Sequence, residues 1–433
     1  SMINNRNLRH EWFVHFVCSL LFVFATDTSL QADHNKMLQR EYRAGISRHV
    51  TCDSHGYCYL LLPEGTSEGN SGFAVQVSQQ PHPQRMSDFS AGISIPTLTQ
   101  TGTKTVFSAG LSIDSDDLLH LIWTTDDGLT AYSVVESKLL RTGPDKAKWL
   151  HPVSRREGAL VVAPDPSWAG DICKAPNGQV WITWVTNAAN TSEVIVHLGT
   201  LRKGKWQSFE LVRGEKLYPP SMAISQDGAS FHIACGDTLG ATRTMHGKFS
   251  ELGSDRQWKL VRSHSGNRPA LAEMDGKVLA VHESGDSLKY TFLVPGVRTR
   301  QPQPLTDLDN RLVWDTVHSP RLVVDHHGVP WMFFIDSTRQ HVFYSRWLGT
   351  RWSPILNGFW LTRNTARFES NHLSIDWLGV EQGLGADNSS IGITIGHRSQ
   401  PPKASFELVS VPSLKSDVGT KILFLDLKEV QHI

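Results

Sequence analysis

The stretch VHSPRLVVDHHGVPWMFFIDSTRQHVFYSRWLGTRWSP, residues Val317 to Pro354, decides the fold. Its apolar runs predict three strands and the start of a fourth, at Leu322–Val324, Val329–Ile335, His341–Trp347 and Arg351–Ser353. The turn Asp325–Gly328 ends in glycine, which adopts a positive φ at little cost. Because the strands are apolar almost throughout, we expect burial on both faces of the sheet.

The strand–turn–strand unit of this stretch recurs along the chain. Further copies lie at Val50–Leu62, Gly110–Trp123, Asp171–Trp184, Ser221–Cys235 and Ala270–His282. The turns of the six units centre on Gly56, Asp116-Asp117, Gly178, Gly228, Gly276 and Gly328. A seventh, weaker copy covers His372–Ile395, with an expanded turn, and is followed by apolar runs at Ser405–Val411 and Ile422–Leu427. A spacing of roughly fifty to sixty residues is the length of a four-stranded sheet with its loops.

These repeats predict an all-β fold, because a four-stranded sheet covered on both faces by its neighbours is the blade of a β-propeller. We expect a single seven-bladed β-propeller of four-stranded antiparallel blades, with six blades as the alternative. Two stacked β-sandwiches would explain the strands but not their regular spacing. We expect Ile422–Leu427 to join the first blade and leave no free edge. Asn35–Arg43 is the one sizeable helix that we predict after residue 32.

The N-terminal part has the pattern of a secretory signal peptide. Basic residues precede the apolar run Trp12–Ala25, and a polar stretch follows it up to Ala32. The run is short for a membrane span, and an N-terminal helix packed on the domain is the alternative. We therefore expect a signal peptide at residues 1–32, with Ser1 a remnant of cloning, and a propeller domain at residues 33–433.

The cysteines fit an exported protein. Cys52 and Cys58 flank the turn of the first repeat, and export favours a disulfide between them. Cys173 and Cys235 lie in apolar strand contexts and are predicted to be buried thiols.

Composition narrows the function. The formal net charge of zero and the pI of about 7.3 favour neither nucleic acid nor a membrane surface as partner. The fourteen tryptophans suit packing between blades, or a surface on which sugars stack. The chain contains no dinucleotide, phosphate-loop, HExxH or GxSxG motif, so we expect no cofactor and no metal among the site residues, with a structural cation in the channel as the alternative. The pair His326-His327 falls on a turn and is interpreted as solvated.

In a propeller, the residues before each first strand and after each second strand converge on one mouth of the central channel. Before the first strands stand Arg48-His49, Trp168 with Asp171, Tyr218, Asn267-Arg268, His318 with Arg321, and Asn371-His372. After the second strands stand Asp126-Asp127, Asn187, Asp237, His282-Glu283 with Asp286, and Asp336 with Arg339. The set is rich in His, Arg and Asp, which suits an acidic sugar.

Arginine pairs with a carboxylate, and His or Tyr exchanges protons, which is what β-elimination of a uronate requires. Glycoside hydrolysis needs two carboxylates instead. The predicted catalytic residues are His318, His372, His282, Tyr218 and Glu283. The predicted substrate-binding residues are Arg268, Arg321, Arg339, Asp126, Asp237, Asp336 and Trp168. For each residue taken alone, a structural hydrogen bond between loop and strand is the competing interpretation.

The repeats resemble the sialidase-like, BNR-repeat β-propellers of secreted carbohydrate-active proteins. The resemblance lies in Ser112–Trp123 and Asp325–Trp331, which are similar to the strand–turn–strand units of the branch with ulvan lyases and related rhamnose–glucuronate enzymes. It implies a seven-bladed fold and an extracellular polysaccharide substrate. Thr125-Asp126-Asp127 stands where that branch often carries a His pair, and the absence of an Arg-Ile-Pro segment argues against sialidase activity.

The sequence thus predicts a secreted or periplasmic protein that cleaves an acidic, uronate-containing polysaccharide by lyase or hydrolase chemistry. The alternative is a non-catalytic propeller that binds a glycan or a protein. We expect no nucleic-acid partner and no membrane insertion of the mature chain.

Overall fold

The computed structural model describes the chain between residues 48 and 412, with gaps. The described residues are 48, 50–65, 71–81, 83, 88–90, 93–94, 106–125, 127–163, 166–188, 191–254, 258–274, 276–285, 287–294, 301–305, 317–324, 329–336, 341–353, 356–360, 372–377, 388–397 and 403–412. The predictions for the signal peptide, the helix Asn35–Arg43, the pair His326-His327 and the closing strand Ile422–Leu427 lie outside them.

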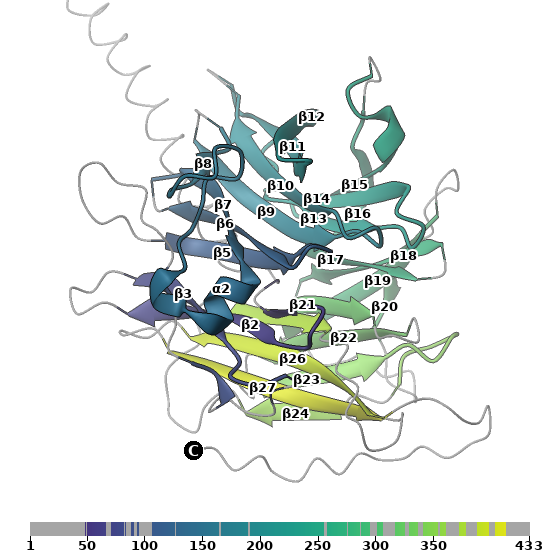
Figure 1. Cartoon of the computed structure of the whole chain (residues 1–433). Helices are drawn as coiled ribbons and strands as arrows, with labels where there is room; N and C mark the ends of the chain where they lie inside the picture. Colours follow the sequence, from purple (N-terminus) through teal and green to yellow (C-terminus); the bar gives the residue numbers. More distant parts are fainter. Residues whose placement is uncertain are drawn as a thin grey trace, which may run out of the picture. The chain divides into compact units, whose positions relative to one another are not determined.

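The described strands form seven antiparallel sheets (Figure 1). Within each sheet, every strand pairs with the strand that follows it along the chain. The first three sheets comprise β1 (Val50–Cys52), β2 (Cys58–Gly65), β3 (Ser71–Val77) and β4 (Ile93–Ser94); β5 (Val106–Ile113), β6 (Leu118–Thr125), β7 (Thr130–Glu136) and β8 (Leu160–Val161); and β9 (Ser167–Lys174), β10 (Val180–Asn187), β11 (Glu193–Arg202) and β12 (Lys205–Glu215).

The next three sheets comprise β13 (Ser221–Ile224), β14 (Ser230–Gly236), β15 (Ala241–Lys248) and β16 (Val261–Ser265); β17 (Asn267–Met274), β18 (Lys277–Ser284), β19 (Ser287–Leu293) and β20 (Gln303–Pro304); and β21 (Val317–Val324), β22 (Pro330–Asp336), β23 (His341–Arg346) and β24 (Leu356–Trp360). The last sheet has three described strands, β25 (His372–Trp377), β26 (Asn388–His397) and β27 (Lys403–Pro412). The prediction of an all-β chain of four-stranded antiparallel sheets is confirmed for six of the seven.

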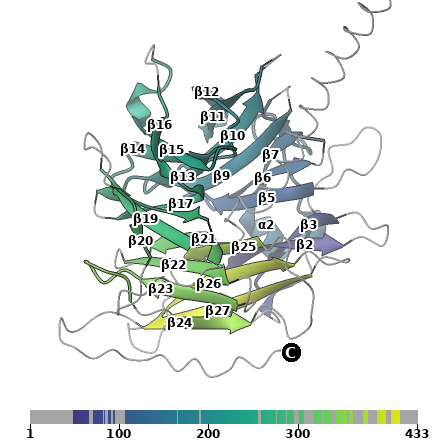
Figure 2. The same cartoon turned by 180° about the vertical axis from the view of Figure 1, so that it is seen from behind.

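The first strands of successive sheets contact one another. The series runs β1, β5, β9, β13, β17, β21 and β25, and β25 in turn contacts β1. Figure 2 shows β21 beside both β17 and β25, and in Figure 1 β26 and β27 lie beside β2, although more than three hundred residues separate them in the sequence. The last described sheet therefore packs on the first.

The predicted turns are present wherever the structure describes them. Gly56, Gly178, Gly228 and Gly276 have φ between 69° and 83°, and Asp117 has a φ of 56°. At Gly178 a side chain would also collide with the neighbouring sheet, because a Cβ there would lie 2.4 Å from Cβ of Ser115. Glycine at this turn thus permits both the backbone conformation and the contact between sheets.

Large aromatic side chains fill the space between the sheets. Trp123, Trp168, Trp184 and Trp331 are among the largest side chains that are almost completely buried. For these four tryptophans the packing interpretation is confirmed, and sugar stacking on them is excluded by burial.

The cysteines behave as predicted. Cys52 and Cys58 are direct partners across the β1–β2 hairpin and form a disulfide. Cys173 and Cys235 are buried thiols that take no part in the disulfide, and burial raises the pKa of Cys235 to about 12.

One helix, α2 (Ser137–Thr142), was not predicted from the sequence; it lies between β7 and β8, before the short 3-10 helix η2 (Pro144–Lys146). A second 3-10 helix, η3 (Phe249–Glu251), follows β15. Helix α2 has six residues and no side-chain cap, so its own propensity stabilises it little. Instead, Leu140 is buried in the core beside the first sheet, and Arg141 Nε lies 3.3 Å from Asp53 Oδ2. Tertiary contacts therefore hold the helix.

A buried hydrogen-bond chain links the second sheet to its first turn. His120 Nδ1 bonds to the hydroxyl of Tyr132, and His120 Nε2 lies 3.1 Å from Asp114 Oδ2. His120 and Tyr132 are at most 2% exposed. Burial opposes ionisation of Asp114, but the bond to His120 and two amide donors outweigh it and lower the pKa of Asp114.

Replacing Tyr132 with Phe leaves a buried imidazole nitrogen without its partner. We expect Tyr132→Phe to lower the free energy of unfolding by about 1–3 kcal/mol. The measurement is urea unfolding followed by fluorescence. Tyr290→Phe is the matched control, because Tyr290 is partly exposed, and it should change the free energy much less. Equal effects of both substitutions would contradict a special role for the buried chain.

Two histidines, the buried His232 and the half-buried His197, predict how stability depends on pH. Desolvation lowers the pKa of His197 and of His232 from the ordinary value of 6.5 to about 4. Between these pH values the unfolded chain binds protons that the folded chain does not, so stability decreases as the pH falls from 6.5 towards 4.

Substituting His232 with Gln removes one of the two imidazoles that take up a proton on unfolding in this pH range. In that pH window, the slope of unfolding free energy against pH should decrease by up to about 1.4 kcal/mol per pH unit. Urea unfolding at a series of pH values measures the slope. A slope unchanged by His232→Gln would show that His232 does not take up a proton on unfolding.

Candidate ligand-binding cavity

The first strands of six sheets enclose a cavity of about 560 Å³, here called the central cavity. Its lining residues come from β1, β5, β9, β13, β17 and β21, together with Arg48, Pro176 and Gln226. Backbone and small or branched apolar side chains form most of the wall. Polar groups are also well represented, since Arg48, Thr51, Ser112, Lys174, Gln226 and Glu273 are among the lining residues.

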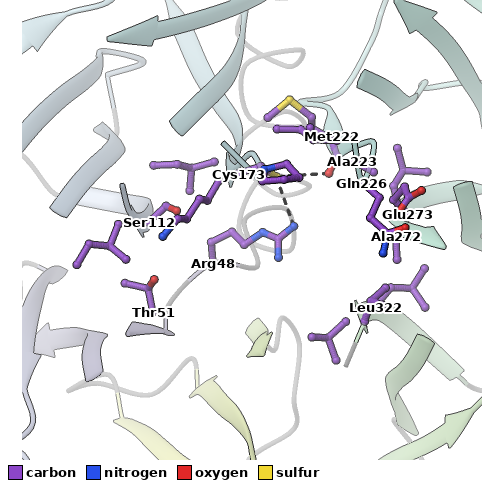
Figure 3. A pocket seen from close by; sticks show the side chains of 18 of the residues that line it. Arg48, Thr51, Ser112, Cys173, Met222, Ala223, Gln226, Ala272, Glu273 and Leu322 are labelled. Atoms are coloured by element: carbon purple, nitrogen blue, oxygen red, sulfur yellow. Dashed lines mark hydrogen bonds between the residues drawn. The ribbon is translucent and has the colours of Figure 1, made fainter. Parts of the chain in front are cut away.

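Arg48 projects into the middle of the central cavity (Figure 3). Its carbonyl oxygen accepts a hydrogen bond of 2.8 Å from Leu111 N, which fixes the backbone against β5. Its Nη2 donates to Cys173 Sγ at 3.4 Å, and its Nε lies 3.5 Å from Asp171 Oδ1. The side chain remains 22% exposed, so its guanidinium is positioned yet accessible to a ligand.

Asp171 joins two neighbouring sheets. Its Oδ2 accepts a hydrogen bond from Met222 N on β13 at 3.0 Å, and its Oδ1 accepts one from Ile172 N at 2.9 Å. Gly170, just before it, permits the approach of β13, because a Cβ there would lie 2.5 Å from Pro220 Cδ. The carboxylate therefore positions both Arg48 and the start of β13.

Irregular strand pairing near the start of the first strands helps to orient the side chains at this end of the central cavity. The register against the second strand shifts at this end in β5, β9, β17 and β21. The shift in β9 falls between the pairs formed by Ala169 and Asp171, and the shift in β21 between those formed by His318 and Arg321. Such bulges re-aim a side chain without changing the rest of the strand.

Arg321 lies beside the same end of the central cavity. It is 5% exposed, and its Nη1 donates to the carbonyl of Pro320 at 2.8 Å. A second cavity of about 10 Å³, large enough for roughly one water molecule, is lined by Arg321, Arg48, Asp171 and Ser221 among others. Two arginines and one aspartate are thus among the residues that line this small space.

The other end of the central cavity carries Lys174, Gln226 and Glu273. Lys174 Nζ donates to the carbonyl of Asp114 at 3.5 Å, and Glu273 Oε1 accepts from Gly276 N at 2.9 Å. Arg48 and Asp171 were expected at a channel mouth from their place before the repeats. The side chains at the opposite end were not predicted, because the sequence does not show which strand residues face the channel.

Several predicted site residues are buried against the protein. Asp237 is 1% exposed, and its carboxylate accepts bonds from Leu239 N, Ala241 N and Arg243 Nε, each at 2.9 Å. Trp168 is packed against Gly128, and His282 is completely buried against Gly266. Tyr218 is 6% exposed. None of these four lines the central cavity.

The remaining predicted residues have less structural description. Glu283 is half-buried in β18 and does not line the central cavity. For His318, His372, Arg268 and Asp336 only the strand position is described. Asp126 and Arg339 lie outside the described residues. Of the predicted set, Arg321 is therefore the residue that the described structure brings together with Arg48 and Asp171.

Within the described part of the chain, no group of three or more His, Cys, Asp or Glu side chains is arranged to hold a metal ion. The described helices are also too short or too polar to cross a membrane.

Comparisons with known proteins give structural likenesses alone. No family model and no curated protein matches the sequence. The polysaccharide lyase Uly1 matches with a TM-score of 0.48 and 11% identity over 85% of this chain and 90% of its own. The GH93 α-L-arabinofuranosidase of Fusarium graminearum, solved with arabinobiose, matches with a TM-score of 0.46 and 13% identity over 70% and 92%. The six-bladed fucose-binding Aleuria aurantia lectin matches with a TM-score of 0.39 and 15% identity over 72% and 93%. At these values the likenesses assign neither a blade number nor an activity to this chain.

Asp171→Asn tests the link between the sheets. The asparagine side chain keeps one acceptor oxygen but lacks the negative charge with which the carboxylate of Asp171 holds Arg48 and the two backbone N–H groups. We expect a loss of about 2–3 kcal/mol in unfolding free energy, measured by urea titration. The exposed Asp116→Asn substitution is the control and should change it little. Wild-type stability of Asp171→Asn would contradict the positioning role.

Proposed function

We propose that this chain is an exported seven-bladed β-propeller that binds an acidic, uronate-containing glycan in the central cavity. The observation that carries the proposal is the position of Arg48 inside the central cavity, held 3.5 Å from Asp171, with Arg321 beside them at the same end. Export rests on the N-terminal pattern of residues 1–32 and on the disulfide.

Seven blades are supported by the arrangement of the sheets. The described residues form seven sheets, and their first strands contact one another in chain order. The contact of β25 with β1 supports a ring that closes with the seventh sheet rather than the sixth.

The size and charge of the cavity support a sugar acid as the ligand. A volume of about 560 Å³ is within the range of small-molecule sites. A guanidinium group forms two parallel hydrogen bonds with a carboxylate, which fixes the orientation of a uronate. The apolar wall from Ile172, Leu271 and Leu322 suits the C–H faces of a sugar ring.

Cleavage requires proton transfer in addition to binding. Among the predicted catalytic residues, His282 and Tyr218 are buried away from the central cavity, and Glu283 does not line it. We therefore propose binding as the function, with lyase or hydrolase chemistry by His318 and His372 as an outcome that the same experiment detects.

Titration calorimetry with short oligoglucuronates, and with the same oligosaccharides after reduction of their carboxyl groups, tests the proposal. We expect binding of the acidic form alone. Arg48→Gln should weaken it about 10- to 100-fold, because a charge-assisted hydrogen bond is lost. Arg48→Lys should recover part of the affinity. Lys248→Gln, an exposed change at the end of β15, is the control and should bind like the wild type.

The same mixtures are followed for absorbance of an unsaturated uronate and for new reducing ends. Absorbance identifies a lyase, and reducing ends without absorbance identify a hydrolase. Equal binding of the acidic and reduced oligosaccharides, or wild-type affinity of a folded Arg48→Gln protein, would contradict the carboxylate-binding role. Thermal unfolding establishes that each variant is folded.

A further inference from the structure

Exposed basic residues gather in two connections that the central cavity does not use. Arg155 and Arg156 lie in the connection between α2 and β8, and Arg202, Lys203 and Lys205 surround the hairpin between β11 and β12. All five side chains are exposed. This is a local excess of positive charge in a chain whose formal net charge is zero. Together with Trp206, we call these residues the basic edge.

Acidic neighbours do not neutralise the basic edge. Among the described residues, Glu157 pairs with Lys148 at 2.5 Å and Glu210 pairs with Arg213 at 2.7 Å. Asp114, the carboxylate that acts on nearby Tyr132, is bonded to His120. No described carboxylate forms an ion pair with the five basic residues, so their charges are directed to solvent.

Tyr132 brings the two connections together. Burial raises the pKa of its hydroxyl, and the charge of nearby Arg155 opposes that rise. The Tyr132 ring lies 5.2 Å from the ring of Trp206, with a tilted arrangement. Trp206 pairs with Leu201 directly beside the hairpin turn. Tyr132 is also the direct partner of Leu160 on β8, the strand that follows Arg155 and Arg156. The connection before β8 and the β11–β12 hairpin therefore both lie near Tyr132.

Both connections are held in fixed conformations. Arg155 and Lys203 adopt φ of 56° and 49°, which non-glycine residues seldom do. Arg155 N donates to the carbonyl of His151 at 2.9 Å, and His151 N donates to the carbonyl of Arg156 at 2.7 Å. The basic side chains are thus displayed from ordered turns, which lowers the entropy cost of binding.

Trp206 adds an aromatic surface to the basic edge. It is partly exposed, and its inner part packs over Gly199, where a Cβ would lie 2.6 Å from the ring. Its ring centroid is 5.9 Å from that of Trp184. A fixed, partly exposed indole beside guanidinium groups can stack on the apolar face of a sugar while the cations pair with its anionic groups.

We propose that the basic edge is a second binding site, which takes a long polyanionic polysaccharide that carries carboxylate or sulfate groups. The basic edge is separate from the central cavity, since none of its residues lines that cavity. A nucleic acid could also pair its phosphates with the cations and stack a base on the indole. The neutral overall charge and pI of about 7.3 favour the polysaccharide, since domains that bind nucleic acid are usually strongly basic.

Affinity electrophoresis of the full chain in gels with polyglucuronate, a sulfated polysaccharide or neutral dextran tests this site. We expect retardation by the two anionic polymers and none by dextran, with a decrease as salt is raised. The triple variant Arg155→Asn, Arg156→Gln and Lys205→Gln should bind about tenfold more weakly. Asparagine suits the backbone at position 155 because it tolerates positive φ.

The matched control removes three exposed cations elsewhere, as Lys248→Gln, Lys259→Gln and Arg351→Gln. It should bind like the wild type. Trp206→Phe should weaken binding less than the triple variant does. It should leave the salt dependence of polysaccharide binding the same as in the wild type.

Three results would overturn the proposal: equal weakening by the control, wild-type binding by the triple variant, or tighter binding of double-stranded DNA than of either polysaccharide. Short oligoglucuronates separate the two sites, since the triple variant should still bind them in the central cavity. Failure of that binding in the wild type would contradict the proposed function and not the basic edge.

Discussion

Burial of both faces of each sheet is the constraint on which the structure depends. A strand such as β22, PWMFFID, leaves large side chains on both faces, and Trp331, Met332, Phe333 and Phe334 are all buried. One neighbouring sheet covers one face only, so each sheet requires two neighbours. The first strands then lie together, and the space between them becomes the central cavity.

The same arrangement determines what the cavity offers to a ligand. Main chain and modest apolar side chains form its wall, and the charged groups enter mainly at the ends of the strands. Asp171 is engaged by the amides of Ile172 and Met222, which makes it a firm anchor for Arg48. The proposed binding of an anion depends on the guanidinium that this carboxylate holds in place.

Much of the fold could be predicted because its signals are local. Apolar runs and turn glycines such as Gly56 and Gly178 depend on the residues around them, and the cysteine pair spans a single hairpin. Helix α2 could not be predicted, because Leu140 and Arg141 stabilise it through the first sheet.

For the site, Arg321 was predicted from its place before a repeat. Lys174 and Glu273 were missed, since the direction of a strand side chain depends on how the sheets pack. Trp206 and the connection before β8 both lie near Tyr132, and this proximity depends on how the second and third sheets pack.

The bulges near the start of β5, β9, β17 and β21 have a consequence for divergence among related chains. A bulge separates the few residues before it from the regular pairing that follows. Substitutions there can redirect a charge towards the channel while the hydrophobic contacts between sheets stay the same. Side-chain changes at this end of the cavity are thus largely uncoupled from the packing of the core.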